Sequence, residues 1–138
     1  SMKAKYALKA LTYMAQHSTE AVRSRRIAES ENIPQKFLDN ILQDLRNSGF
    51  VDAKRGIFGG YFLAKPASDI RIGDIIRVID GPLAPIRCAS LSAYQKCDDC
   101  VDEAACQLRR LMADVRNAMS SVLDQRCLQD LIDSSEAA

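Results

Sequence analysis

Residues 33–63 read IPQKFLDNILQDLRNSGFVDAKRGIFGGYFL, and this stretch decides the fold. Pro34 suits the first turn of a helix, because it lacks an N–H that would be unpaired there in any case. Behind it, apolar residues recur at steps of three and four, which predicts a helix with one apolar face. These residues are Phe37, Leu38, Ile41, Leu42 and Leu45. Gly49 is the expected end of the helix, since glycine adopts the left-handed conformation at no steric cost.

Two short strands are expected after this helix, FVDAK at residues 50–54 and YFLAK at residues 61–65. The loop between them, RGIFGG, holds three glycines and one arginine, which predicts a basic β-hairpin. A polar-faced helix followed by such a hairpin suits the major groove and the phosphates of a duplex. An ordinary helix packed on an ordinary hairpin explains this stretch equally well, so the residues before and after it must decide between a DNA-binding and a purely structural role.

The residues before this stretch predict two further helices, over residues 4–16 and residues 24–31. Ser24 is the candidate N-cap of the second helix, and Asn32 is its expected stop. Two short helices joined by a few residues, the second with a polar outward face, form the helix-turn-helix pattern. With the hairpin added, the pattern becomes a winged helix-turn-helix.

Charge is distributed unevenly along the 138 residues, although the net charge is only +1. Residues 1–66 carry a net charge of +5, and residues 67–138 carry −4. A basic first half indicates a region that faces a polyanion. No run of 18 apolar residues and no signal-peptide core are found, so we expect a cytoplasmic protein without a membrane span. In that compartment, five cysteines are more typical of ligands or redox groups than of structural disulfides.

The second half of the chain predicts a helix over residues 70–80, then an irregular loop, then a long amphipathic helix. The long helix extends beyond what so small a core needs, so its apolar stripe is expected to pack against a second copy. Packing against the first helix is the alternative. The stripe consists of Leu108, Leu111, Met112, Val115, Ala118, Met119 and Val122.

The expected fold is therefore mainly α with a small β-hairpin. A winged helix-turn-helix DNA-binding domain would occupy residues 1–81, and a cysteine-containing loop residues 82–102. The long dimerisation helix and a C-terminal helix would occupy residues 103–138. No nucleophile–base pairing is visible and the single histidine ends a helix, so no enzyme is expected.

Four cysteines gather around the irregular loop: Cys88, Cys97, Cys100 and Cys106. Four thiolates within 19 residues could bind zinc, copper(I) or an iron–sulfur cluster. One C-x-x-C pair without a second does not define a zinc ribbon. We favour a ligand function, and a reducible disulfide or spare cysteines are the alternatives.

Several segments together resemble the Rrf-two family of bacterial transcription regulators, over nearly the whole chain. They are YALKAL from Tyr6, the run from Ile27 to Leu42, LRNSGFV from Leu45, the wing RGIFGGYFLAKP, DIIRVIDGPLAPI from Asp74, and the cysteine loop. The resemblance implies a winged-helix homodimer that binds a partly palindromic double-stranded DNA operator, as a repressor in the favoured interpretation. It also implies that the long helix crosses to the partner and supports a cysteine site near the interface.

The resemblance also implies which residues contact DNA. They are Gln35, Lys36, Asp39 and Asn40 on the helix, and Arg55, Gly56, Gly59, Gly60 and Tyr61 in the wing. Asparagine can pair with adenine, and aspartate can accept a hydrogen bond from cytosine. Arg55 would enter the minor groove, where negative potential is concentrated. The wing glycines would let the backbone approach closely.

The sequence departs from the family pattern at the cysteines. Cluster-binding members offer three cysteines at short, near-equal spacings plus a fourth ligand; Cys100 and Cys106 match the later pair. Cys88 lies farther upstream than usual, Cys97 is an additional candidate, and Arg109 stands where some members place a histidine ligand. The resemblance makes an iron–sulfur cluster of two or four irons the favoured modulator of operator affinity, whereas the departure leaves open which three cysteines and which fourth ligand would hold it.

Two other functions stay open. The first is a cluster-free regulator that is switched by oxidation of Cys97 with Cys100, or by a partner protein. The second, of another class, is a protein-interaction module that uses the apolar stripe of the long helix.

Overall fold

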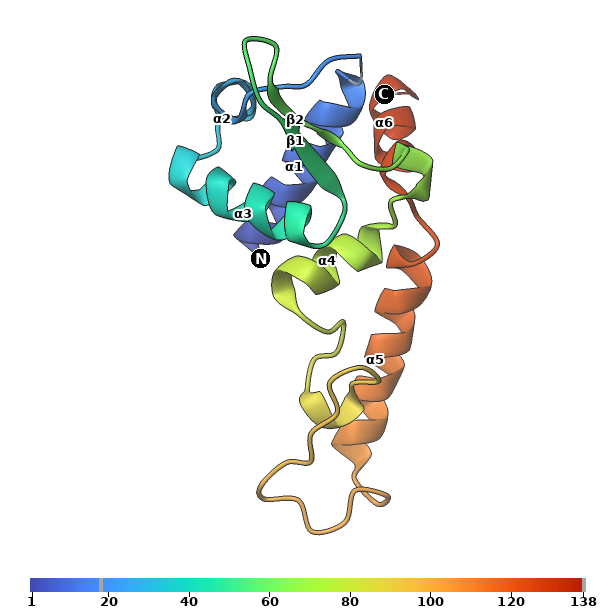
Figure 1. Ribbon diagram of the computed structural model, residues 1–138. Coiled ribbons are helices and arrows are strands. Elements are labelled where there is room, and N and C mark those ends of the chain that lie inside the picture. The colour runs from blue at the N-terminus through green and yellow to red at the C-terminus, as the bar shows by residue number, and fades with distance from the viewer. Residues whose placement is uncertain (18, 138) are drawn as a thin grey trace.

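The computed structural model describes residues 1–17 and 19–137, with side chains described as far as residue 134. The helices are α1 (Met2–Gln16), α2 (Ser24–Glu31), α3 (Gln35–Asn47), α4 (Ile72–Asp80), α5 (Gln107–Leu123) and α6 (Leu128–Ala137). Strands β1 (Val51–Lys54) and β2 (Gly60–Leu63) pair in an antiparallel hairpin, and η1 (Ala67–Asp69) and η2 (Arg87–Ala89) are single 3-10 turns. The mainly helical fold with one small hairpin is confirmed (Figure 1).

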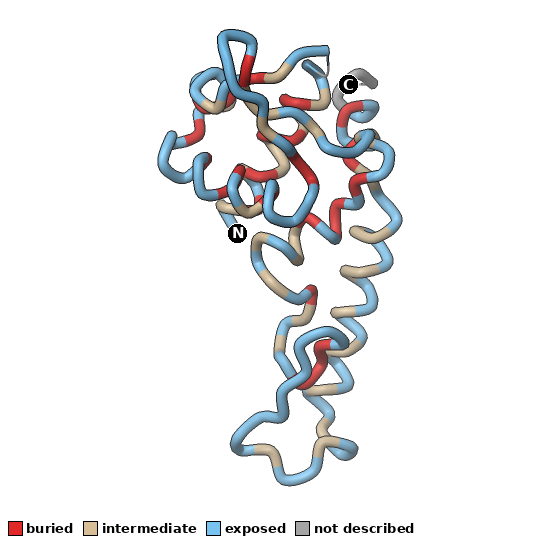
Figure 2. The backbone as a smooth tube through the Cα atoms, viewed as in Figure 1, coloured by how far each residue is buried: buried red, intermediate tan, exposed pale blue. Residues whose placement is uncertain are grey.

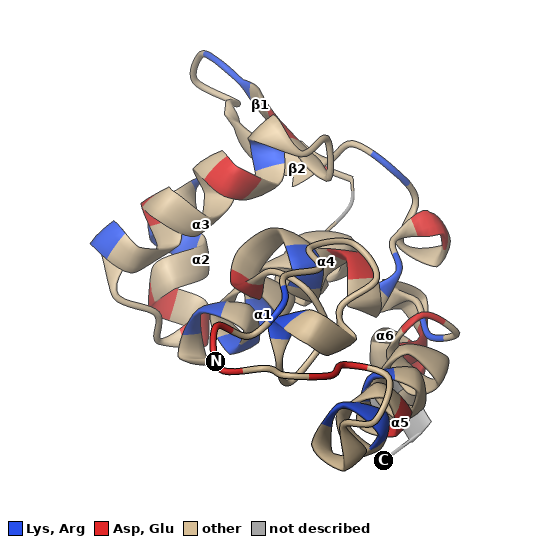
Figure 3. Cartoon of the chain, turned by 90° about the horizontal axis from the view of Figure 1, so that it is seen from below, with Lys and Arg blue, Asp and Glu red and all other residues tan. Residues whose placement is uncertain are grey.

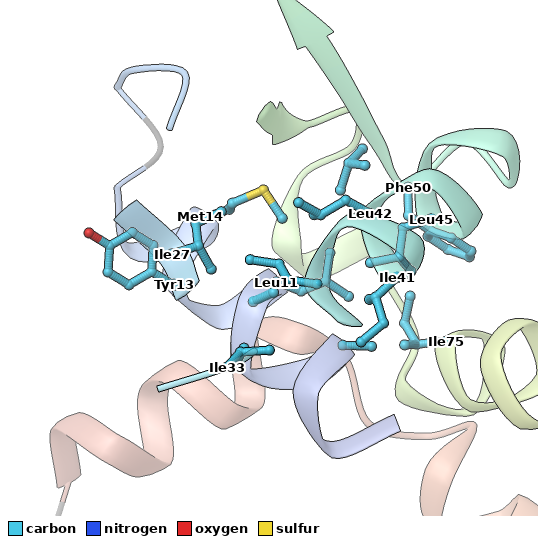
Figure 4. Packing of buried hydrophobic residues seen from close by; sticks show 14 of the residues in the cluster. Leu11, Tyr13, Met14, Ile27, Ile33, Ile41, Leu42, Leu45, Phe50 and Ile75 are labelled. Atoms are coloured by element: carbon cyan, nitrogen blue, oxygen red, sulfur yellow. The ribbon is translucent and has the colours of Figure 1, made fainter. Parts of the chain in front are cut away.

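Helix α1 is the centre of the winged domain, because it contacts α2, α3, α4, α6 and β2. Ala7 and Ala10 on α1 are fully buried, and their small side chains let the neighbouring helices approach closely. Leu11 and Met14 fill the space between α1 and the helix-turn-helix, and Figure 4 shows their side chains among those of the core. One hydrophobic core thus unites elements from both ends of the sequence.

Helix α3 is held by its apolar face. Leu38, Ile41, Leu42 and Leu45 are fully buried in the core. Each such side chain contributes roughly 1.5–3 kcal/mol by leaving water, so packing rather than helix propensity fixes the orientation of α3. Phe37, predicted on the same face, is instead 44% exposed and contacts Tyr6 edge to face. The helical period identifies the apolar stripe but does not show that Phe37 lies at its edge.

The turns around α3 follow the expected chemistry at two residues and differ at a third. Asn32 ends α2 in the left-handed conformation, and Gly49 follows α3 with φ +82°. Ser24 is not the N-cap of α2, because Arg23 occupies that position. Ser24 is the first helical residue, and its hydroxyl accepts a hydrogen bond from Gln35 Nε2 at 3.0 Å. The hydroxyl therefore joins α2 to the start of α3.

Helix α5 projects from the winged domain, and the cysteine loop lies at the end of α5 that is far from the hairpin tip (Figure 1). No residue of α5 is buried, whereas buried residues concentrate in the winged domain (Figure 2). Helix α6 returns to that domain: Leu128 is fully buried in the core, and its N–H donates to Ile70 O at 2.8 Å. The last helix, which the sequence groups with the long helix, thus belongs to the winged domain by its contacts.

A bidentate ion pair joins the winged domain to the end of α5. Arg77 on α4 donates to both carboxylate oxygens of Asp124, at 2.8 Å and 2.6 Å. The arginine holds the pKa of the Asp124 carboxyl below its usual range, mainly through this hydrogen bond. Gly73 lies against the same carboxylate, and a Cβ there would come within 2.0 Å of Asp124 Oδ1. The junction is thus closely packed as well as charged.

None of the helices that the structure describes is long and apolar enough to cross a membrane.

Candidate nucleic-acid interface and cysteine loop

The first two turns of α3 present a polar surface to solvent. Gln35, Lys36, Asp39 and Asn40, the predicted base-contacting residues, are all exposed. Gln35 Nε2 donates to Asp39 Oδ1 at 2.9 Å as well as to the Ser24 hydroxyl. These side chains therefore lie outside the core, and two of them, Gln35 and Asp39, already make side-chain hydrogen bonds.

The wing ends in a tight turn. The Gly59 N–H donates to Gly56 O at 3.0 Å, which leaves Ile57 and Phe58 at the two central positions. A Cβ at Gly59 would lie 2.3 Å from Lys54 O, and a Cβ at Gly60 would lie 2.4 Å from the Val22 backbone. Both glycines are thus required by close contacts inside the protein, independently of any approach to DNA. Gly56 has open space around it and is required by its φ of +107°.

The wing is attached to the segment that precedes α2. Val22 and Tyr61 exchange two backbone hydrogen bonds, at 2.8 Å and 2.7 Å. Arg23 Nη2 donates to the carbonyls of Gly56 and Ile57, at 2.8 Å and 3.2 Å. Tyr61, a predicted DNA contact, is half-buried here, and Arg55 is exposed. Arg23 carries no motif that marks it as a functional residue; its only sequence signal is its position among basic residues just before α2.

Adjacent residues therefore connect the wing with the start of α3. Arg23 bonds to the wing, and the next residue, Ser24, bonds to Gln35 of α3. Between the wing tip and the start of α2 lies an open hollow of about 620 Å³, lined by Arg23, Arg26 and Lys54 among others. Figure 3 shows basic segments on the hairpin and around α2 and α3, with acidic residues among them. This face combines exposed hydrogen-bonding groups with positive charge, as a duplex-binding surface requires.

The predicted dimerisation stripe of α5 divides into two parts. Met112 and Met119 are half-buried. The other five residues are exposed and are spaced by three and four residues, as in a helix–helix seam. We call them the exposed seam: Leu108, Leu111, Val115, Ala118 and Val122. Packing within the chain thus leaves most of the stripe uncovered.

The cysteine loop is attached to α5 through two backbone carbonyls. Arg109 Nε donates to Cys88 O at 3.0 Å, and Arg116 donates to Ala89 O. Cys106 is the N-cap of α5, and its sulfur accepts from the Arg109 N–H at 3.4 Å. Cys88 is buried, and its Sγ lies 3.8 Å from Cys97 Sγ.

The predicted metal ligands are of the right chemical type, but only Cys88 and Cys97 are in direct contact. Within residues 1–17 and 19–137, no three histidine, cysteine or acidic side chains are grouped so that they could hold a metal ion. The hydrogen bond to Cys88 raises the pKa of the Cys97 thiol, and partial burial raises the pKa of Cys100. Both shifts keep the metal-free thiols protonated, so a metal ion would have to displace their protons on binding. In this arrangement, no three of Cys88, Cys97, Cys100 and Cys106 are grouped as a bound iron–sulfur cluster would require.

Three comparisons with known proteins place the chain among transcription regulators. A relative from Rhodobacter capsulatus, named an rrf2-like HTH-type transcriptional regulator, is 43% identical over 142 residues, covering 100% of this chain and 95% of the relative. Among solved structures, CymR (YrzC), the global cysteine regulator of B. subtilis, is 32% identical with a TM-score of 0.78, covering 97% of this chain and 95% of that one. T. potens IscR is 30% identical with a TM-score of 0.75, covering 98% of this chain and 86% of that one.

A family model, Rrf2, described as an iron-dependent transcriptional regulator, matches residues 1–134. The match spans the winged domain, the cysteine loop and α5 together, and the relatives are regulators rather than enzymes. The chain therefore belongs to the Rrf2 family of DNA-binding transcriptional regulators.

Proposed function

We propose that this regulator is a homodimer that binds a partly palindromic DNA operator with α3 and the wing, and that it represses transcription. The connection between the two elements carries the proposal: Arg23 holds the wing while Ser24 holds Gln35. Two reading elements that are fixed to each other can enter adjacent grooves in one defined register. A separate helix and hairpin would not have a fixed spacing.

The residues of this face divide by the part of the duplex that they suit. Asn40 and Asp39 can read base edges in the major groove, and Lys36 can contact a phosphate or guanine. Arg55, exposed on the wing, suits a narrow minor groove. Each good base contact is worth about 1–3 kcal/mol.

Selection of duplexes from a random-sequence pool, followed by gel-shift titration, tests the proposal. We expect Arg55→Ala to weaken binding of the selected duplex by about 1–3 kcal/mol at physiological salt. Arg126→Ala, which removes an exposed arginine between α5 and α6, is the matched control and should bind as wild type does. Failure to select any duplex, or equal affinity for wild type and Arg55→Ala, would contradict the proposed interface.

For the control of operator affinity, the arrangement of the sulfurs favours thiol oxidation between Cys88 and Cys97. A peroxide would take two electrons and two protons from the two thiols, which leaves one S–S bond, and would be reduced to water. This pair replaces the Cys97–Cys100 pair expected from the C-x-x-C spacing, because Cys88 Sγ lies 3.8 Å from Cys97 Sγ. Arg109 donates a hydrogen bond to the Cys88 carbonyl and is the residue next to Leu108 of the exposed seam. A change at Cys88 can therefore affect the proposed dimer interface on α5.

Mass spectrometry after hydrogen peroxide treatment tests this pairing. We expect a peptide pair that links Cys88 with Cys97, its loss in Cys88→Ser, and its retention in Cys127→Ser. A link between Cys97 and Cys100 would contradict the proposed pair. Iron and sulfide analysis after anaerobic reconstitution tests the cluster separately: stoichiometric iron that is lost in Cys88→Ser would favour the cluster over the thiol pair.

A further inference from the structure

Two large apolar side chains occupy the tip of the wing, where the fold has no use for them. Ile57 is 87% exposed and Phe58 is 85% exposed, the central pair of the turn from Gly56 to Gly59. Glycine, proline, asparagine, aspartate and serine dominate such positions, because they satisfy turn geometry and interact well with water. Ile57 and Phe58 are outside the hydrophobic core cluster, so their presence does not follow from folding.

The tip is held firmly although it is exposed. Arg23 bonds to the carbonyls of Gly56 and Ile57, and the Val22–Tyr61 bridge anchors the base of the hairpin. A tip that is ordered before binding loses little conformational entropy when it inserts into a partner. The wing therefore presents Ile57 and Phe58 as a preformed apolar projection.

The surroundings of the tip indicate the chemistry of its partner. Arg23, Arg26 and Lys54 line the hollow beneath Ile57 and Phe58, and Arg55 precedes the turn. Glu20 is the one acidic residue among the described residues that line this hollow. A partner with apolar surfaces between closely spaced negative charges matches this pattern, and the stacked bases of a duplex between two phosphate strands are such a partner.

We propose that Ile57 and Phe58 form a wedge that inserts from the minor groove into one base step next to the Arg55 contact. The inference rests on the proposed DNA-binding function and adds a way to read sequence. Apolar side chains between base pairs unstack the step and kink the duplex. Pyrimidine–purine steps deform most easily, so the wedge selects such a step without any hydrogen bond to a base.

The experiment uses the full-length chain and a duplex selected by the wild-type protein from a random-sequence pool. 2-Aminopurine is placed in turn at the steps on either side of the wing contact, because its fluorescence rises when a base unstacks. We expect wild type to raise the fluorescence at one step, and Ile57→Ala/Phe58→Ala to abolish the rise and weaken binding about tenfold or more. Phe62→Ala, which removes a 36% exposed aromatic from β2 below the tip, is the matched control and should keep both properties.

A second measurement separates insertion from other uses of the tip. Replacing the unstacked pyrimidine–purine step by a stiff A-tract step should weaken wild type and leave the double variant unaffected. Phe58→Leu, which keeps an apolar wedge, should retain most of the fluorescence rise. Circular dichroism of each variant confirms that the fold is intact.

Two outcomes would overturn the wedge while leaving DNA binding in place. In the first, the double variant binds the selected duplex as wild type does, which would assign the tip to a protein partner. In the second, binding weakens but no step shows a fluorescence rise, which would assign the tip to the sugar–phosphate backbone. If wild type selects no duplex at all, the proposed function itself fails.

Discussion

Placing one charge on the exposed seam tests the proposed dimer. Leu111 is 55% exposed and lies within the seam, so Leu111→Asp adds a carboxylate without opening the core of the subunit. Full burial of a leucine side chain is worth roughly 1.5–3 kcal/mol, so covering its exposed half contributes about 1 kcal/mol in each protomer. A carboxylate in an apolar contact adds a desolvation penalty of at least about 1 kcal/mol on each side.

The two subunits together lose about 4 kcal/mol, which corresponds to roughly a thousandfold rise in the dimer dissociation constant. Sedimentation velocity over a wide concentration range measures this constant directly. The thermal midpoint of the monomer should change little, because Leu111 is not part of the core. Half-site affinity for DNA should survive, while affinity for a full palindromic operator should fall with the loss of the dimer.

Asn117→Asp is the matched control, because it places the same charge on an exposed residue of α5 outside the seam. The new carboxylate can still accept the hydrogen bonds that Arg116 now makes to the Asn117 side chain. Equal dimer dissociation constants for the two variants would refute the assignment of the seam to the dimer interface. A monomeric wild type at micromolar concentration would refute it as well.

The junction and the wing give two further predictions. Because the folded-state pKa of Asp124 lies below its unfolded value, the stability from the Arg77 pair is complete above the unfolded pKa and is lost as the pH falls through the folded pKa. Thermal melts of Asp124→Asn should therefore show a free energy of unfolding about 1 kcal/mol lower than wild type at pH 7, and this difference should disappear at low pH. The difference is small because both side chains are about one-third exposed. A difference that does not change with pH would exclude this cause. Arg23→Ala should weaken duplex binding about fivefold with little change in melting temperature, since it removes two charge-assisted hydrogen bonds that order an exposed wing. Increased proteolytic cleavage at Ile57–Phe58 would report the loosened turn, and an unchanged cleavage rate would argue against it.

The sequence predicts the winged domain well, because its elements depend on local rules. The apolar spacing of three and four residues predicts a helix face, and the residues on that face are fully buried in the structure: Leu38, Ile41, Leu42 and Leu45. Asn32 and Gly49 mark the helix ends through the backbone conformation that they tolerate. Such signals do not depend on distant parts of the chain.

Contacts between residues that are distant along the chain leave no local signal in the sequence. Arg23 donates to backbone carbonyls 33 and 34 positions away. Every residue has a backbone carbonyl, so no sequence motif identifies these acceptors. The neighbours of a cysteine are hard to predict for a related reason: C-x-x-C spacing suggests Cys97 with Cys100, whereas the path of the loop also brings Cys97 Sγ within 3.8 Å of Cys88 Sγ. Leu128 likewise pairs with Ile70 and enters a core that its position near the end of the chain does not indicate.

The separation of the wing and the cysteine loop constrains how one could influence the other. They lie at opposite ends of the molecule (Figure 1), so a change at Cys88 has to pass along α5 or through the second subunit of the proposed dimer. Arg109 near the start of α5 and Arg116 near its middle hold the loop, and the Arg77–Asp124 pair attaches the end of α5 to α4. Because α5 is attached near both of its ends, a change at the loop can shift DNA affinity only if it favours one orientation of α5 over another. If the proposed thiol pair forms, its oxidation should therefore alter the spacing of the two wings in the proposed dimer while the contacts within each winged domain stay the same.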